Sequence, residues 1–187
     1  MPYIDLPEGL PGITGGFAFR PETAKPMREL AHILLHEPSS LTPGQRELIA
    51  TYVSAQNDCY FCHSSHGAAA ACHLEDANLV QQVKTNFHRA QISRKLKSLL
   101  VIAGQVRKGG KHVTIDAIEQ ARLLGATDLE IHDTVLIAAA FCMYNRYVDG
   151  LGTWQPHDEA MYTEMGEHLA EEGYQATSLP QPEVVPR

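Results

Sequence analysis

The stretch TPGQRELIATYVSAQNDCYFCHSSHGAAA, residues 42–70, predicts two consecutive helices. Its first residues carry the signature of a helix start, because Thr42 can cap the helix, Pro43 suits the first helical position and Gln45 completes a capping box. Apolar residues then return every three or four positions, which is the period of a helix that buries one face. We expect this first helix to end near Asn57.

The second helix of this stretch begins at the cysteines. Asp58 is placed to cap a helix that opens on Cys59 and runs to about His73. Cys59 and Cys62 would then lie in its first turn, where free backbone N–H groups and the positive end of the helix dipole stabilise a thiolate. The alanines at 68–71 would let a neighbouring helix approach closely.

The helical period continues on both sides of this stretch, and we find no alternation of period two that would indicate strands. Further helices are expected at about 21–36, 75–87, 92–108, 114–124, 127–150 and 157–171. The sequence therefore predicts an all-α fold, a compact multi-helix bundle.

The two ends of the chain have a different composition from the middle. Residues 1–21 are rich in glycine and proline and show no periodic apolar face, so we expect an extended N-terminal arm. Residues 172–187 lead into a proline-rich end and are expected to form a loose C-terminal tail. Residues 22–171 then form one helical domain.

Charge and composition exclude several classes of partner. The formal net charge of -7 over 187 residues argues against a nucleic-acid or anionic membrane partner, since both need clustered Lys and Arg. No run approaches the ~18 apolar residues of a membrane span, and the first residues lack the pattern of a signal peptide. We expect a cytoplasmic protein, and there a Cys-x-x-Cys is a redox or metal motif rather than a structural disulfide.

Three chemistries compete for the segment 58–66, DCYFCHSSH. Cys59, Cys62 and His63 have the spacing of c-type haem attachment, which normally follows export, and no export signal is present. The two cysteines with His66 could bind zinc, but they supply only three of four ligands and no second Cys-x-x-Cys exists. We favour a redox dithiol without metal or cofactor; a metal-binding or redox-sensing protein without turnover is the alternative.

The candidate catalytic residues share one face of the second helix. At about 100° per residue, Cys59, Cys62 and His66 lie on the same side. His66 is placed to take the thiol proton or to pass a proton to a leaving oxygen. Glu47, on the preceding helix, could orient the imidazole and complete a Glu–His–Cys relay. Cys59 is expected to be the more exposed sulfur and Cys62 the activated one.

The remaining cysteines and histidines receive structural interpretations. Cys72 and Cys142 lie in alanine-rich apolar stretches and are expected to be small buried hydrophobes. His32 and His36 are expected on an ordinary helix surface, and His63 is expected to be exposed or to pack against neighbours.

Two segments carry a resemblance to a known family. Glu47 followed by YVSAQNDCYFCHSSHGAAA resembles the Glu, Cys-x-x-Cys, x-x-x-His signature of the AhpD-like alkylhydroperoxidases in the carboxymuconolactone decarboxylase superfamily, especially their peroxidase-related branch. The segment 121–152, ARLLGATDLEIHDTVLIAAAFCMYNRYVDGLG, resembles the helix pair and the Asn-Arg…Asp ending of that branch. The resemblance covers about residues 22–165.

The resemblance implies an all-α fold and reduction of a hydroperoxide substrate. Cys62 would be the peroxidatic thiol and Cys59 the resolving one, with electrons from a thiol donor such as a dihydrolipoyl or thioredoxin-like protein. Phe61 stands where AhpD proteins often carry a histidine, so one proton carrier is missing. Decarboxylase members of the superfamily lack the cysteine pair, which disfavours decarboxylation.

The resemblance also implies assembly into dimers, trimers or hexamers. The sequence gives a reason of its own, because Val135 to Met143 is apolar almost all round. We therefore expect a homo-oligomer whose interface uses the helix at 127–150 or the N-terminal arm.

Overall fold

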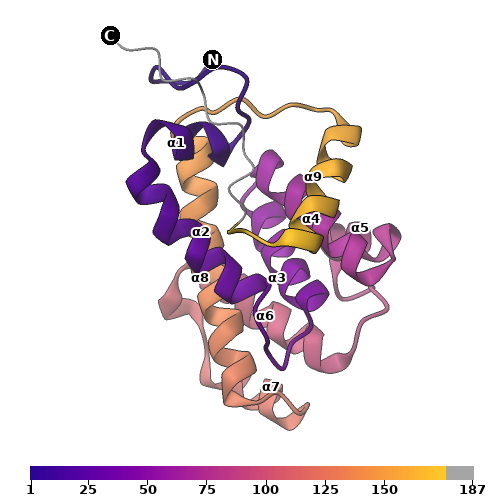
Figure 1. Cartoon of the computed structure of the whole chain (residues 1–187). Coiled ribbons are helices and arrows are strands. Elements are labelled where there is room, and N and C mark those ends of the chain that lie inside the picture. Colours follow the sequence, from indigo (N-terminus) through magenta and orange to yellow (C-terminus); the bar gives the residue numbers. More distant parts are fainter. Residues whose placement is uncertain (176–187) are drawn as a thin grey trace.

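The computed structural model describes residues 1–175, and over these residues it is helical without strands (Figure 1). The helices are α1 (Ile13–Phe19), α2 (Pro21–Leu35), α3 (Pro43–Gln56), α4 (Tyr60–Leu74), α5 (Ala77–Asn86), α6 (Arg94–Lys108), the 3-10 turn η1 (Gly110–His112), α7 (Ile115–Leu123), α8 (Asp128–Gly150) and α9 (Glu159–Glu172). The all-α prediction is confirmed. Within residues 1–175, no helix has the length and apolar character needed to cross a bilayer.

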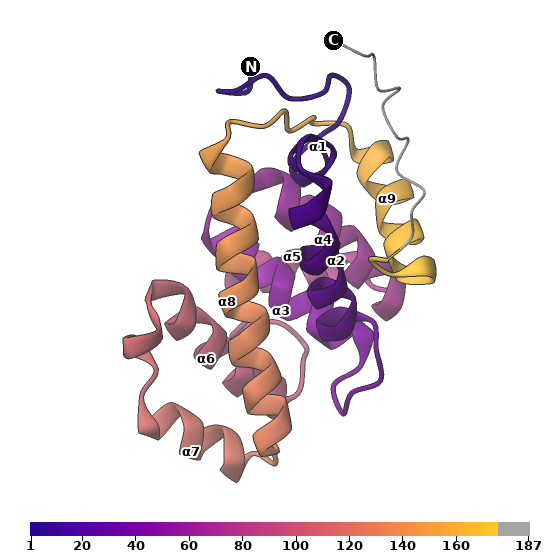
Figure 2. The same cartoon turned by 60° about the vertical axis from the view of Figure 1, so that its left-hand side comes forward.

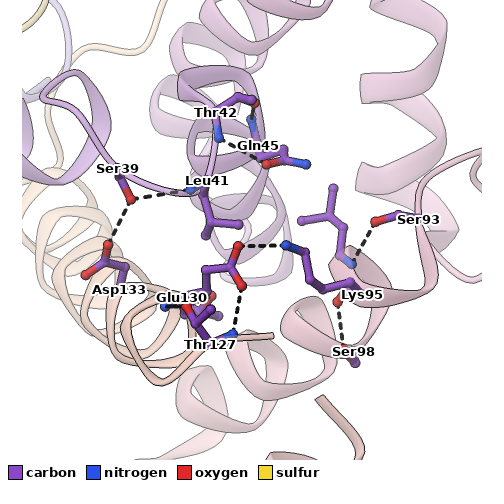
Figure 3. Close-up of polar contacts among 12 residues, drawn as sticks. Ser39, Leu41, Thr42, Gln45, Ser93, Lys95, Ser98, Thr127, Glu130 and Asp133 are labelled. Atoms are coloured by element: carbon purple, nitrogen blue, oxygen red, sulfur yellow. Dashed lines mark hydrogen bonds and ion pairs between the residues drawn. The ribbon is translucent and has the colours of Figure 1, made fainter. Parts of the chain in front are cut away.

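Capping boxes start α3 and α8. The hydroxyl of Thr42 accepts the backbone N–H of Gln45 at 3.2 Å, and the Gln45 side chain accepts the N–H of Thr42 at 3.0 Å. Thr127 and Glu130 repeat this arrangement at the start of α8 (Figure 3). Both boxes satisfy N–H groups that a helix start otherwise leaves unpaired, so the sequence defines these two starts locally.

An ion pair between a half-buried lysine and a buried glutamate joins α8 to α6 (Figure 3). Lys95 Nζ donates to Glu130 Oε1 at 2.7 Å, and the Glu130 side chain is only 2% exposed. Burial opposes the charged carboxylate, but the hydrogen bonds from Lys95 and from the Thr127 N–H outweigh it and hold the pKa of Glu130 below its ordinary value. The carboxylate thus serves both as cap and as link between helices.

Helix α3 lies at the centre of the bundle and contacts α4, α5, α6 and α8. Its side chains Leu48, Ile49, Ala50 and Val53 are almost completely buried in the main core. Helix α4 folds back along α3 and is covered on its other side by α9 (Figures 1 and 2). The site residues on α3 and α4 therefore lie inside the bundle.

Small residues let α9 lie directly on α4. A Cβ at Gly166 would lie 2.5 Å from the Cβ of Ala68, so the two carbon atoms would clash unless one helix moved. The close approach that we expected from the alanines at 68–71 is present, and its partner is α9. This approach brings the residues that follow α9 to the candidate site.

The N-terminal arm differs from the prediction, since residues 1–21 contain α1 and the first residue of α2. Gly16 of α1 lies against the Tyr147 ring of α8, where a Cβ would lie 2.5 Å from the phenolic oxygen. The Gly12 N–H donates to Trp154 O at 2.7 Å, which joins the arm to the loop after α8. Glycines that argue against helix by propensity are used here for close packing.

The predicted C-terminal tail also begins differently. Glu172 is still in α9, Gly173 is buried, and Tyr174 is half-buried against the rest of the bundle. Residues 176–187 of the predicted tail lie outside the described residues.

Candidate active site

The reversal between α3 and α4 places the cysteines. Asp58 does not cap α4: its φ of 60° makes the left-handed turn, and Cys59 occupies the N-cap position. Aspartate tolerates this conformation better than most residues. Asn57 Nδ2 donates to Asn145 Oδ1 at 2.8 Å, and the Asn145 amide donates to Ser54 at 3.0 Å. These bonds tie the reversal to α8.

The two sulfurs lie side by side and are both buried. Cys59 Sγ is 3.1 Å from Cys62 Sγ and donates its proton toward it. The relative exposure is 0% for Cys59 and 3% for Cys62, so the expectation that Cys59 is the more exposed sulfur is wrong. The N-cap side chain turns inward, where Cys59 packs in a small cluster with Val148 of α8.

The electrostatics of the pair distinguish the two thiols. The hydrogen bond to Cys62 and burial together raise the pKa of the Cys59 thiol far above its ordinary value. Cys59 therefore keeps its proton and acts as the donor. The sulfur of Cys62 is the acceptor of this hydrogen bond.

The structure brings Glu47 and His66 into direct contact. Glu47 Oε2 lies 2.9 Å from His66 Nδ1, and the side chains are 2% and 14% exposed. The carboxylate can only accept, so the tautomer that satisfies both groups carries its proton on Nδ1 and leaves Nε2 free to accept one. This is the geometry expected for an imidazole oriented as a general base.

Tyr174 completes this group, and the sequence analysis missed it. Its hydroxyl donates to Glu47 Oε1 and lies 3.1 Å from His66 Nδ1. The phenol ring stacks on the imidazole with centroids 5.6 Å apart and an angle of 14°. Burial and the adjacent Glu47 carboxylate raise the pKa of Tyr174 well above its ordinary value, so the phenol stays protonated. Only tertiary structure brings this residue to the site.

A cavity of about 140 Å³ opens beside these residues. Cys62 and His66 line it together, and among the described residues around it Cys62 is the sole cysteine. The rest of its wall is mostly apolar and includes Ile13, Phe17, Met27, Ala31, Phe61, Phe141, Tyr144, Met165 and Leu169, with Thr14, Arg28, Ser65, His168 and Tyr174 as polar members. The cavity therefore gives a bound molecule access to Cys62 and not to Cys59.

Phe61 forms part of this wall. It is 4% exposed, and a Cβ at Gly12 would lie 2.2 Å from its ring carbons. Phe61 therefore supports the contact between α4 and the chain just before α1.

Several structural predictions for the other cysteines and histidines need correction. Cys72 is exposed rather than buried, and Cys142 is half-buried and accepts a hydrogen bond from Asn57 at 3.6 Å. His32 is not on an ordinary surface, because its Nδ1 accepts the backbone N–H of Tyr174 at 3.2 Å. His63 packs against Tyr60, as one of the two expectations had it.

Comparison with known sequences matches residues 21–82 to the carboxymuconolactone decarboxylase family. That match contains Glu47, Cys59, Cys62 and His66. A solved AhpD-core, uncharacterised peroxidase-related protein from Ralstonia eutropha JMP134 is similar with a TM-score of 0.75 and 28% identity, over 83% of this chain and 80% of that one. Residues 21–82 thus match the carboxymuconolactone decarboxylase family, and the chain has the fold of an AhpD-core peroxidase-related protein.

Two further solved structures share the fold of this chain. An uncharacterised peroxidase-related protein from Silicibacter sp. TM1040 has a TM-score of 0.77 and 23% identity, over 87% of this chain and 94% of that one. A protein of unknown function from Agrobacterium tumefaciens, named for the antioxidant defence protein AhpD, has a TM-score of 0.67 and 21% identity, over 79% of this chain and 99% of that one. No protein of curated function matches.

Proposed function

We propose that the protein is a thiol peroxidase or thiol–disulfide oxidoreductase that reduces hydroperoxides through Cys59 and Cys62. One observation carries the proposal: Cys62 lines an apolar cavity together with His66, and the sulfur of Cys59, which does not line the cavity, lies 3.1 Å from the sulfur of Cys62. The peroxidase-related names of the similar structures agree with this reaction class. The apolar wall favours organic hydroperoxides over hydrogen peroxide.

The first step oxidises Cys62. His66 takes the thiol proton at Nε2, and the thiolate attacks the outer oxygen of the hydroperoxide. The O–O bond breaks, Cys62 becomes a sulfenic acid, and the alkoxide leaves as an alcohol with the proton held by His66. Glu47 stabilises the imidazolium that forms between these events.

The second step closes the disulfide. The Cys59 sulfur attacks the sulfenic acid sulfur of Cys62 and displaces water, and the proton of Cys59 leaves with that water. The sulfurs must approach from 3.1 Å to the ~2.05 Å of a disulfide bond. A small movement of one side chain suffices.

The third step needs a thiol electron donor, which we propose to be a dihydrolipoyl or thioredoxin-like protein. Its two thiols reduce the Cys59–Cys62 disulfide and become a disulfide themselves. Because both sulfurs are buried, a dithiol on a slim arm can enter through the cavity, whereas a dithiol on a folded surface requires the covering helices to move. The burial therefore favours the dihydrolipoyl class.

The alternative function is metal binding or redox sensing without turnover. Within residues 1–175, no three His, Cys, Asp or Glu side chains gather as a metal site, so metal binding gains no support from the geometry. A redox sensor would use the same cysteine pair and would differ by failing to turn over with a donor.

Stopped-flow mixing of the reduced protein with a panel of hydroperoxides tests the proposal. We expect oxidation to a Cys59–Cys62 disulfide, seen by mass spectrometry as the loss of two hydrogens, and faster reaction with apolar hydroperoxides than with hydrogen peroxide. Glu47→Gln and His66→Ala should slow this step by ~10²-fold or more, the usual scale of acid–base assistance. Disulfide formation that occurs without turnover in the presence of any dithiol would instead favour the sensor.

A further inference from the structure

We propose that Tyr174 is a positioning residue of the Glu47–His66 relay, so that the chain after α9 is part of the active site. The catalytic role of Tyr174 rests on the proposed function. Tyr174 itself lies outside the family match, which ends at residue 82. The contacts of the phenol carry the argument.

Tyr174 acts on both members of the relay. Its hydroxyl donates to Glu47 Oε1 while His66 binds Oε2, so the two oxygens of one carboxylate are held by different partners. The ring stacks almost parallel on the imidazole and limits its tilt. Glu47 is 1% exposed, and water cannot replace a lost partner at Oε1 without entering the bundle.

The backbone around Tyr174 is itself anchored. His32 Nδ1 on α2 accepts the Tyr174 N–H at 3.2 Å, and the other ring nitrogen of His32 lies 3.3 Å from Glu37 Oε1. Gly173 has a φ of +69°, and a Cβ there would lie 2.5 Å from His32 Nδ1. The glycine permits both the left-handed turn and the close approach, and the turn directs Tyr174 inward.

The chemical role follows from these constraints. A carboxylate fixed at both oxygens holds the proton of His66 on Nδ1 and leaves Nε2 as the acceptor of an imidazole that lines the cavity together with Cys62. Without the phenol, Glu47 can rotate, and the neutral imidazole can then carry its proton on either nitrogen. The fraction of His66 in the reactive tautomer would fall.

Tyr174→Phe tests the role, because it removes the hydroxyl and keeps the ring that stacks on His66. The matched control is Tyr162→Phe, which removes a buried hydroxyl on α9 that donates to Pro156 O at 2.8 Å and does not contact Glu47. Nitrogen-15 NMR of the reduced full chain reports which ring nitrogen of His66 carries the proton. Thermal unfolding of both variants reports how much of any change is loss of fold.

We expect His66 to carry its proton on Nδ1 in the wild type and in Tyr162→Phe, and to populate both tautomers in Tyr174→Phe. Peroxide oxidation of Cys62 should slow about 10-fold to 100-fold in Tyr174→Phe, the range for a lost hydrogen bond to a charged group. An unchanged His66 spectrum in a folded Tyr174→Phe protein would overturn the inference. The spectrum decides this even if the wild type reduces no hydroperoxide, which would refute the proposed function instead.

Discussion

Cys59 and Cys62 are equally hidden from solvent but differ in what each can meet. Cys62 forms part of the cavity wall, whereas Cys59 lies behind it in the small cluster with Val148. The Cys59 thiol, whose pKa is raised by its bond to Cys62 and by burial, is a poor nucleophile until Cys62 has been oxidised. Access to the cavity is thus a second physical reason to expect the division of labour that proximity to His66 predicted.

We therefore predict that Cys62→Ser abolishes reaction with hydroperoxide, while Cys59→Ser reacts once and stops at a sulfenic acid. A sulfenic-acid trapping reagent followed by mass spectrometry distinguishes the two products. Cys72→Ser, which changes an exposed cysteine elsewhere on α4, is the control and should behave as wild type. Retention of the first reaction by Cys62→Ser, with its loss in Cys59→Ser, would reverse the roles.

His63 gives a prediction about pH. Burial, with a contribution from Lys84, lowers the pKa of His63 to about 4. A histidine in the unfolded chain has a pKa near 6.5. Between about pH 6.5 and 4, His63 is therefore protonated in the unfolded chain but neutral in the folded protein. The neutral histidine therefore costs stability progressively as the pH falls through this window.

His63→Gln should remove this loss. We expect the free energy of unfolding of the variant, relative to wild type, to increase as the pH falls from 7 to about 4.5, measured by urea denaturation at each pH. His112→Gln changes an exposed histidine of η1 and is the control. A difference between His63→Gln and wild type that stays constant with pH would contradict the pKa of His63.

At the scale of elements, the start of α8 depends on one carboxylate with two partners. Glu130 accepts from Lys95 and from the Thr127 N–H, and its pKa is lowered in the folded state. Its stabilisation is therefore complete above the ordinary carboxyl pKa of about 4.3 and is lost as the pH falls through the lower folded value.

We predict that Glu130→Gln destabilises the protein by about 1–3 kcal/mol at pH 7, because it removes the charged partner of the half-buried Lys95. The difference from wild type should shrink below about pH 4, as the wild-type carboxylate also becomes neutral. Urea denaturation measures both effects. Glu119→Gln, on the exposed face of α7, should change the stability by less than about 0.5 kcal/mol at either pH.

The elements also separate what sequence can predict from what it cannot. The starts of α3 and α8 are local, because a cap and the residue three positions later define each one. Helix α1 was missed because Gly15 and Gly16 lower helix propensity, and the close contact of Gly16 with Tyr147 depends on tertiary packing. The Glu47–His66 contact follows from two adjacent helices, whereas Tyr174 reaches Glu47 only because α9 lies on α4.

For the whole molecule, homo-oligomer formation remains a prediction. Of the apolar run in α8, Ile137, Ala138 and Phe141 are buried in the chain's own core, but Ala139 and Met143 are exposed. The exposed positions are four residues apart and share one face of α8, where a second copy could cover them.

We expect analytical ultracentrifugation at micromolar concentration to show a dimer, trimer or hexamer, and Met143→Glu to shift it toward the monomer. Leu123→Glu places the same charge at an exposed apolar position of α7 and is the control. A wild-type protein that sediments as a monomer would refute the oligomer, and an oligomer unaffected by Met143→Glu would place the interface elsewhere.

The distance along the chain between Tyr174 and its partner affects the order of folding. Glu47 and His66 are 19 positions apart, so a local pair of helices can bring them together early. Tyr174 and Glu47 are 127 positions apart, and closing that loop costs more chain entropy. During refolding, the Glu47–His66 contact should therefore form before Tyr174 reaches it. We expect an intermediate in which Glu47 and His66 are paired but the tyrosine that fixes the second carboxylate oxygen is not yet in place.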